Sequence, residues 1–158
     1  MSVTNDPDFA PIATRIRDSV GRQGFMSHVG AELSELTRGG CTLAVDRRPE
    51  LLQQHGLFHG GVTAFLVDNA TTIAAATSRG QAALTAEYKL NLLSPATGER
   101  LICRARVIKP GRQSLSSRQT CFASLTVSRS TPQRRWLRSR CSMKRRPLES
   151  QTRPDGRV

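Results

Sequence analysis

The chain has 158 residues and a formal net charge of +12, a length that suits one domain with a moderate core. It has no run of 18 apolar residues, and its polar, acidic start lacks the apolar stretch of a signal peptide, so we expect a cytoplasmic protein without a membrane span. No C-x-x-C pair occurs, which favours reduced thiols over a metal or redox role for the four scattered cysteines, Cys41, Cys103, Cys121 and Cys141.

The excess positive charge is confined to the last third of the chain. Residues 1–110 hold 12 Lys/Arg and 10 Asp/Glu, whereas residues 111–158 hold 12 Lys/Arg and only 2 Asp/Glu. A nucleic-acid-binding function would therefore rest on the C-terminal third alone. Its two basic runs, 134–135 and 144–146, have only Trp136 as a nearby aromatic residue, which is weak support for base stacking.

Periodicity predicts an alternation of helices and strands up to residue 108. Helices are expected where apolar residues recur every three or four positions, and strands where they alternate. Asp8 is the expected N-cap of the first helix, and Pro11 falls in its first turn, where a missing N–H is no loss. The expected elements are a helix over 8–22, strands over 25–36 and 40–47, a loop over 49–58, a helix over 61–77 closed by Gly80, and strands over 83–92 and 100–108.

His59-Gly60-Gly61 at the start of the long apolar helix is the most informative motif. Glycines at a helix N-terminus leave backbone N–H groups open to a ligand, and such donors can hold a carbonyl oxygen that gains charge during a reaction. Asp68 follows about two turns later at ~3.6 residues per turn. A carboxylate inside an apolar helix is costly unless it has partners or a task. The segment thus offers an oxyanion site and a general base or nucleophile.

This motif, with Leu-x-Asp-x-Ala on the helix, resembles the hotdog-fold acyl-CoA thioesterases of the phenylacetate-degradation (PaaI-like) type. Segments 53–56, 84–96 and 98–112 are similar to that family's approach loop, central strand and following turn, so the likeness covers roughly residues 25–115. The resemblance implies an α+β hotdog fold, in which a curved antiparallel sheet wraps around one long central helix. The expected organisation is an N-terminal helical segment over 1–24, the hotdog domain over 25–144 and a disordered basic tail over 145–158.

The resemblance also implies the site. Asp68 would activate water or attack the thioester, and the Gly60 N–H would bind the thioester oxygen. His59 would orient the acyl group or fix the loop, while Thr85 and Gln53 would position water or substrate. Gln53 departs from the asparagine common in relatives.

The resemblance also implies substrate-binding residues. We expect substrate binding from Gly61 and Asn69, and from Lys109 and Arg112 toward the phosphates of coenzyme A.

Hydrolysis of an acyl-CoA thioester is the expected reaction, with coenzyme A as part of the substrate and no cofactor or metal. The family implies a homodimer with shared sites, in which His59 and Gly60 of one subunit face Asp68 of the other, and dimers that can pair into tetramers. The acyl group is expected to be medium-chain or aryl. The rivals are a non-catalytic or inactivated acyl-CoA binder and a basic nucleic-acid-binding protein.

Residues 114–144 should supply two more strands, yet they are poor in β-branched and apolar residues. One hypothesis is a reading-frame shift near Arg112. If residues 119–123 were encoded CAG-ACC-TGT-TTC-GCC, reading from the third base would give Asp-Leu-Phe-Arg, close to the family's usual fifth strand. The alternative is a diverged but genuine pair of basic-faced strands.

Overall fold

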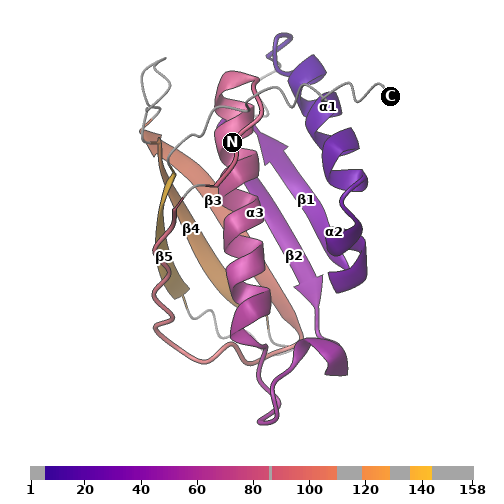
Figure 1. Cartoon of the computed structure of the whole chain (residues 1–158), viewed down its shortest axis with the longest axis vertical. Helices are drawn as coiled ribbons and strands as arrows, with labels where there is room; N and C mark the ends of the chain where they lie inside the picture. Colours follow the sequence, from indigo (N-terminus) through magenta and orange to yellow (C-terminus); the bar gives the residue numbers. More distant parts are fainter. Residues whose placement is uncertain (1–5, 86, 110–118, 129–135, 144–158) are drawn as a thin grey trace, which may run out of the picture.

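A five-stranded antiparallel sheet and one long helix form the body of the protein (Figure 1). The computed structural model describes residues 6–85, 87–109, 119–128 and 136–143, with side chains up to residue 108. Its elements in chain order are α1 (Ala10–Gly21), α2 (Gly24–Val29), β1 (Ala31–Thr37), β2 (Gly40–Asp46), a 3-10 turn η1 (Pro49–Leu51), α3 (Gly60–Arg79), β3 (Arg100–Lys109), β4 (Gln119–Ser128) and β5 (Trp136–Met143).

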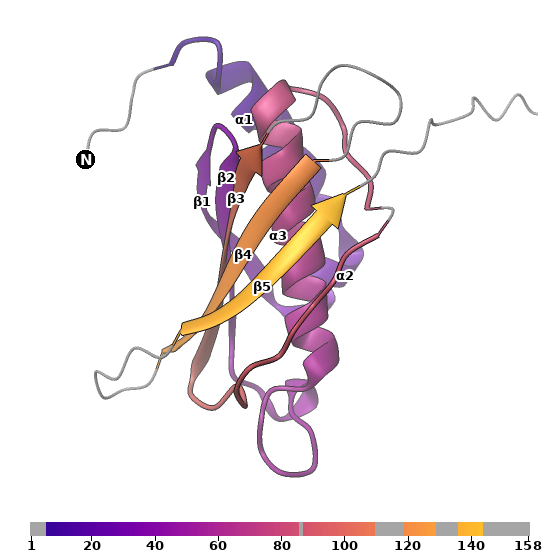
Figure 2. The same cartoon turned by 90° about the vertical axis from the view of Figure 1, so that its left-hand side faces the viewer.

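The strands lie in the order β1-β2-β3-β4-β5, and every neighbouring pair is antiparallel. Helix α3 lies between β2 and β3 in the sequence and packs on one face of the curved sheet (Figures 1 and 2). Alternation explains that face: Leu101, Cys103 and Ala105 of β3 are buried, while Arg104 and Arg106 are exposed. The α+β hotdog arrangement expected from the sequence is confirmed.

Helix α3 is buried because it is apolar on most of its surface. Leu66, Val67 and Ala70 are fully inaccessible to solvent, and they join Leu43 of β2 and other strand residues in one core. The helix was expected over 61–77 and extends slightly further at both ends. Gly80 ends it in the left-handed conformation with φ 65°, as the sequence predicted. Within the described residues, no helix is long and apolar enough to cross a membrane.

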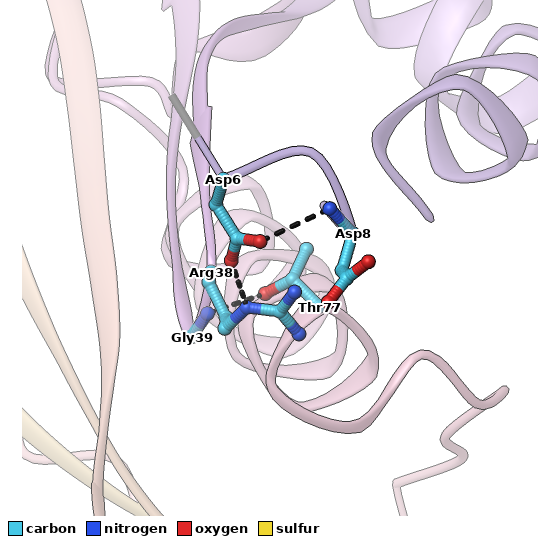
Figure 3. Close-up of polar contacts among 5 residues, drawn as sticks. All are labelled: Asp6, Asp8, Arg38, Gly39 and Thr77. Atoms are coloured by element: carbon cyan, nitrogen blue, oxygen red, sulfur yellow. Dashed lines mark hydrogen bonds and ion pairs between the residues drawn. The ribbon is translucent and has the colours of Figure 1, made fainter. Parts of the chain in front are cut away.

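The N-terminal segment is tied to the turn between β1 and β2 (Figure 3). Asp6 forms an ion pair with Arg38 at 2.7 Å, and this contact lowers the pKa of the Asp6 carboxyl. The Gly39 N–H next to it donates to Thr77 Oγ1 on α3 at 3.0 Å. On α1, the Arg15 side chain donates to the carbonyl of Gly80. These contacts hold α1 beside the end of α3.

Three local expectations were wrong. The α1 helix starts later than predicted, and Phe9 is its N-cap residue, without a side-chain cap. The residues before it form a turn in which the N–H groups of Asp8 and Phe9 donate to Asp6. Pro11 does lie in the first turn. Residues 25–29, expected to begin a strand, belong to α2, whose Met26 and Val29 are buried and which Gly30 ends at φ 69°.

The third error concerns residues 83–92, which were expected to form a strand. The structure assigns no strand to the described residues of this segment. They run back along the β5 side of α3, outside the five-stranded ladder (Figures 1 and 2). Alternating residues are present, but Lys89 is the only described residue of the segment in a β-bridge, and a strand needs a continuous ladder partner as well as a suitable sequence. The large apolar side chains of Leu84, Tyr88 and Leu92 are exposed instead.

The two uncertain strands of the C-terminal third are present in the backbone. β4 pairs with β3, and β5 pairs with β4. The expectation that residues 114–144 supply two strands therefore holds, and whether their sequence arose by a frame shift stays a hypothesis. The predicted tail over 145–158 lies outside the described residues.

Candidate active site

The N-terminus of α3 is capped by the side chain of His59. Its backbone is extended, with φ −62° and ψ 138°, and its Nδ1 accepts a hydrogen bond from the Gly61 N–H at 2.9 Å. A Cβ atom at position 61 would lie 2.9 Å from that same Nδ1, so the cap requires glycine there. An Nδ1 that accepts this bond leaves the proton of the neutral ring on Nε2. His59 therefore holds the motif in shape and presents an N–H donor.

Gly60 carries the open donor at this helix end. The N–H groups of His59, Gly61 and Val62 are bonded to Leu51 O, His59 Nδ1 and His59 O, whereas no acceptor among the described residues pairs with the Gly60 N–H. A Cβ at position 60 would meet only Leu92 Cδ1, at 3.7 Å. The donor is thus free to bind a carbonyl oxygen, as an oxyanion site requires.

Gln53 lies beside this donor. Both Gln53 and Gly60 line a cleft of about 450 Å³ formed by the approach loop, the start of α3 and residues 92–96. Backbone hydrogen bonds shape the loop: the Gln53 N–H donates to Leu57 O at 2.8 Å, and the Gly56 N–H donates to Gln53 O at 2.9 Å. The structure therefore brings together two of the residues expected at the carbonyl end of the site.

Asp68 lines a second cleft, of about 760 Å³, between α1, α3 and residues 81–85. Its Oδ1 atom is buried and has no hydrogen-bond partner within the described part of the chain. A buried acceptor without a partner typically costs about 1–3 kcal/mol. A buried carboxylate oxygen without a partner in a cleft is a candidate for a functional role.

Two threonine hydroxyls lie in the same cleft as Asp68. Thr85 Oγ1 is 2.9 Å from Thr72 Oγ1, and both residues line the cleft. Thr85 was expected from the sequence, whereas Thr72 was missed. Its signal was present: Thr72 follows Asp68 by four residues, and such residues share one face of a helix. A hydroxyl pair next to a carboxylate can hold a water molecule by donating and accepting hydrogen bonds.

The remaining expected substrate-binding residues are placed differently. Asn69 lines the Asp68 cleft, but its amide donates to Phe65 O of its own helix at 3.2 Å. The Gly61 N–H already donates to His59 Nδ1 and is not open to a substrate. Lys109 is described only as the last residue of β3, and Arg112 lies outside the described residues. In the described part of the chain, no group of three His, Cys, Asp or Glu residues could hold a metal ion.

The two halves of the site are far apart within one chain. Gly60 and Asp68 are eight residues apart on one helix, which is ~12 Å along its axis at ~1.5 Å per residue. Reacting groups must approach within about 3–3.5 Å of the atoms they act on. Gly60 and Asp68 also line different clefts, so the donor and the carboxylate of one chain do not face the same space.

The sequence and the fold of the chain are similar to those of known thioesterases. A model of the thioesterase superfamily matches residues 55–124, a range that contains the helix-end motif, Asp68, Thr72 and Thr85. A crystal structure of a thioesterase family protein from Silicibacter pomeroyi is 33% identical, with a TM-score of 0.76; the match covers 84% of this chain and 96% of that one. The chain belongs to the thioesterase superfamily.

Individual relatives carry more specific names. Human acyl-coenzyme A thioesterase 13 is 41% identical over 59 residues, which are 36% of this chain and 42% of that protein, so the matched part spans less than half of the relative. The PaaI protein of the E. coli phenylacetic acid degradation operon has a TM-score of 0.69 at 17% identity, covering 84% of this chain and 92% of that one. At that identity the likeness shows the fold.

Proposed function

We propose that the protein hydrolyses an acyl-CoA thioester to the free acid and coenzyme A. The observation that carries the proposal is the buried, unpartnered Oδ1 of Asp68 in a cleft that also holds the hydroxyls of Thr72 and Thr85. Membership of the thioesterase superfamily supports the reaction class, and the name of the human relative supports acyl-CoA as the substrate class.

In the proposed mechanism the thioester carbonyl oxygen accepts a hydrogen bond from the Gly60 N–H, which stabilises the negative charge that forms there. Asp68 takes a proton from a water molecule held by the threonine pair, and the water oxygen bonds to the carbonyl carbon. The C–S bond then breaks, and the leaving thiolate of coenzyme A takes up a proton. Direct attack by the Asp68 carboxylate, followed by hydrolysis of the mixed anhydride, gives the same products.

We further propose that two subunits share each site. The ~12 Å between Gly60 and Asp68 along α3, and their placement in different clefts, support a donor and a carboxylate that come from different chains. The segment after α3 supports such an interface, because it contributes to both clefts. Its exposed apolar side chains, which cost free energy in water, are Leu84 (54% exposed), Tyr88 (37%), Leu92 (53%) and Leu93 (64%).

In a two-fold symmetric dimer, the same patch on each subunit would cover the other. The His59 and Gly60 of one subunit would then face Asp68 of the other. A homodimer is thus the smallest active unit in this proposal, and dimers can pair into tetramers.

Release of free thiol from a panel of acyl-CoA substrates tests the proposed reaction. Purified protein should release thiol from at least one aliphatic or aryl thioester, and Asp68→Asn should abolish most of that release. Asp18→Asn is the matched control, because Asp18 is exposed on α1 and lines neither cleft. Tight binding of acyl-CoA without thiol release would instead indicate a non-catalytic binder. Salt-sensitive binding of nucleic acid by residues 111–158, without thiol release, would favour the basic-protein alternative.

A further inference from the structure

The wall of the Asp68 cleft formed by α1 and its C-terminal end carries basic side chains among apolar ones. Arg15, Ser19 and Arg22 line the cleft together with Ile16 and Val20, which also belong to the core. Arg22 is the C-cap residue of α1 and follows Arg15 by seven residues, which places both on one side of the helix. The cleft therefore has guanidinium groups along one wall, although a site for a purely hydrocarbon acyl group needs only apolar walls.

The two arginines differ in their partners. Arg15 is engaged, since its side chain donates to the carbonyl of Gly80. The Arg22 guanidinium is exposed and forms no hydrogen bond or ion pair with the residues that the structure describes. Among the described residues that line the cleft, the only acidic one is Asp68, which the proposed reaction uses. Asp18, one turn before Arg22, does not line the cleft, and no ion pair joins the two side chains in the described part of the chain. Arg22 is thus a cation available to an anion that enters the cleft.

The position of Arg22 relative to Asp68 follows from the helix directions. α1 and α3 run in opposite directions (Figure 1), and Arg15 meets Gly80 at the end of α3. Both distances are counted from the Arg15–Gly80 contact, toward the N-terminus of α3. Arg22 follows Arg15 by seven residues, which is ~10 Å from this contact. Asp68 precedes Gly80 by twelve residues, which is ~18 Å from it. Arg22 is therefore displaced from Asp68 by roughly 8 Å along the axis. The lining between these levels includes the apolar Ile73 and Leu84.

We propose that this cleft selects acyl-CoA substrates whose acyl group is short and ends in a carboxylate, and that Arg22 binds that carboxylate. The inference rests on the proposed thioesterase function. The apolar lining would contact the methylene groups, and the guanidinium would pair with the terminal anion through parallel hydrogen bonds. The phosphates of coenzyme A are the other anions of the substrate, but the pantetheine arm holds them away from the thioester on which Asp68 acts.

Equilibrium binding of adipyl-CoA and hexanoyl-CoA tests the inference, because these ligands share six acyl carbons and differ in the terminal carboxylate. Binding is measured on Asp68→Asn protein, which should keep the thioester intact. We expect adipyl-CoA to bind about 10-fold or more tightly than hexanoyl-CoA, the usual scale for a charged hydrogen-bonded pair. Adding Arg22→Gln should remove most of that preference, and Arg22→Lys should keep part of it. Arg17→Gln is the control, since Arg17 is an exposed cation on α1 that does not line this cleft.

Three outcomes would overturn the inference: equal binding of both ligands, a preference unchanged by Arg22→Gln, or an equal loss for both ligands and for free coenzyme A. The last would show that Arg22 binds a phosphate. Thiol release by Arg22-containing wild-type protein separates this inference from the proposed function. If the protein hydrolyses thioesters but shows no preference for adipyl-CoA, only the inference about Arg22 is refuted. If it prefers adipyl-CoA, loses that preference in Arg22→Gln and hydrolyses neither ligand, only the proposed thioesterase function is refuted.

Discussion

Replacing Asp68 by asparagine should lower activity and raise stability together. The side chain keeps its size and shape but loses the charge that a general base or nucleophile needs. Turnover should fall by at least ~100-fold, the usual scale for removing a general base. The stability effect has the opposite sign because Asp68 Oδ1 is buried without a partner, and a neutral amide is less costly to bury than a carboxylate.

The stabilisation can be estimated from the geometry. An unsatisfied buried polar group costs about 1–3 kcal/mol. Asparagine removes the charge but keeps one acceptor and adds two N–H donors, so we assign a relief at the low end of that range, about 1 kcal/mol. For a chain of this length, that corresponds to a rise in Tm of about 2–4 °C. Thermal unfolding by circular dichroism, measured beside thiol release, would detect both effects. A lower Tm with near-normal turnover would show that Asp68 is a structural carboxylate held by a hydrogen-bond partner.

Three further predictions follow from local geometry. In Gly61→Ala the added Cβ would displace the His59 ring that caps α3. The substitution should destabilise the protein by about 1 kcal/mol, the typical value of a helix cap, and lower thiol release. An unchanged Tm would contradict the cap. Burial raises the pKa of the Cys103 thiol, so between pH 7 and pH 9 it should stay protonated and react with iodoacetamide only after unfolding, as peptide mass spectrometry would show. β4 pairs with β3 and β5 pairs with β4 along antiparallel ladders, so the backbone amides of residues 119–128 and 136–143 should be protected from hydrogen exchange. Free exchange across both segments would contradict these two strands.

The N-terminal two thirds of the fold could be predicted because its signals are local. The apolar helix closed by Gly80 and the alternation in β2 and β3 set these elements without reference to distant residues. Errors occurred where tertiary contacts decide. Residues 83–92 have the composition of a strand, but they are not one of the five strands that form the sheet of one subunit.

The residue types of the candidate site could be proposed from the sequence, whereas their contacts could not. The carboxylate at Asp68 and the glycines at the helix start could be found from spacing, and the structure places Thr85 in the Asp68 cleft. The sequence could not show that the Gly61 N–H is bonded to His59 while the Gly60 N–H stays open, because that depends on the ring position. Thr72 was missed because a threonine in an apolar helix looks ordinary until its hydroxyl is seen 2.9 Å from that of Thr85.

Complementation between two inactive variants tests the shared site most directly. Gly60→Pro removes the open N–H with little strain, because proline is favoured at the first helical position and His59 before it already has the extended backbone that proline requires. Asp68→Asn removes the carboxylate.

After subunit exchange in an equal mixture, half of the dimers should be heterodimers, each with one intact site. The mixture should therefore recover about a quarter of wild-type thiol release, as a two-fold symmetric shared site requires. Heterodimers detected by native mass spectrometry, without any recovered thiol release, would contradict the account.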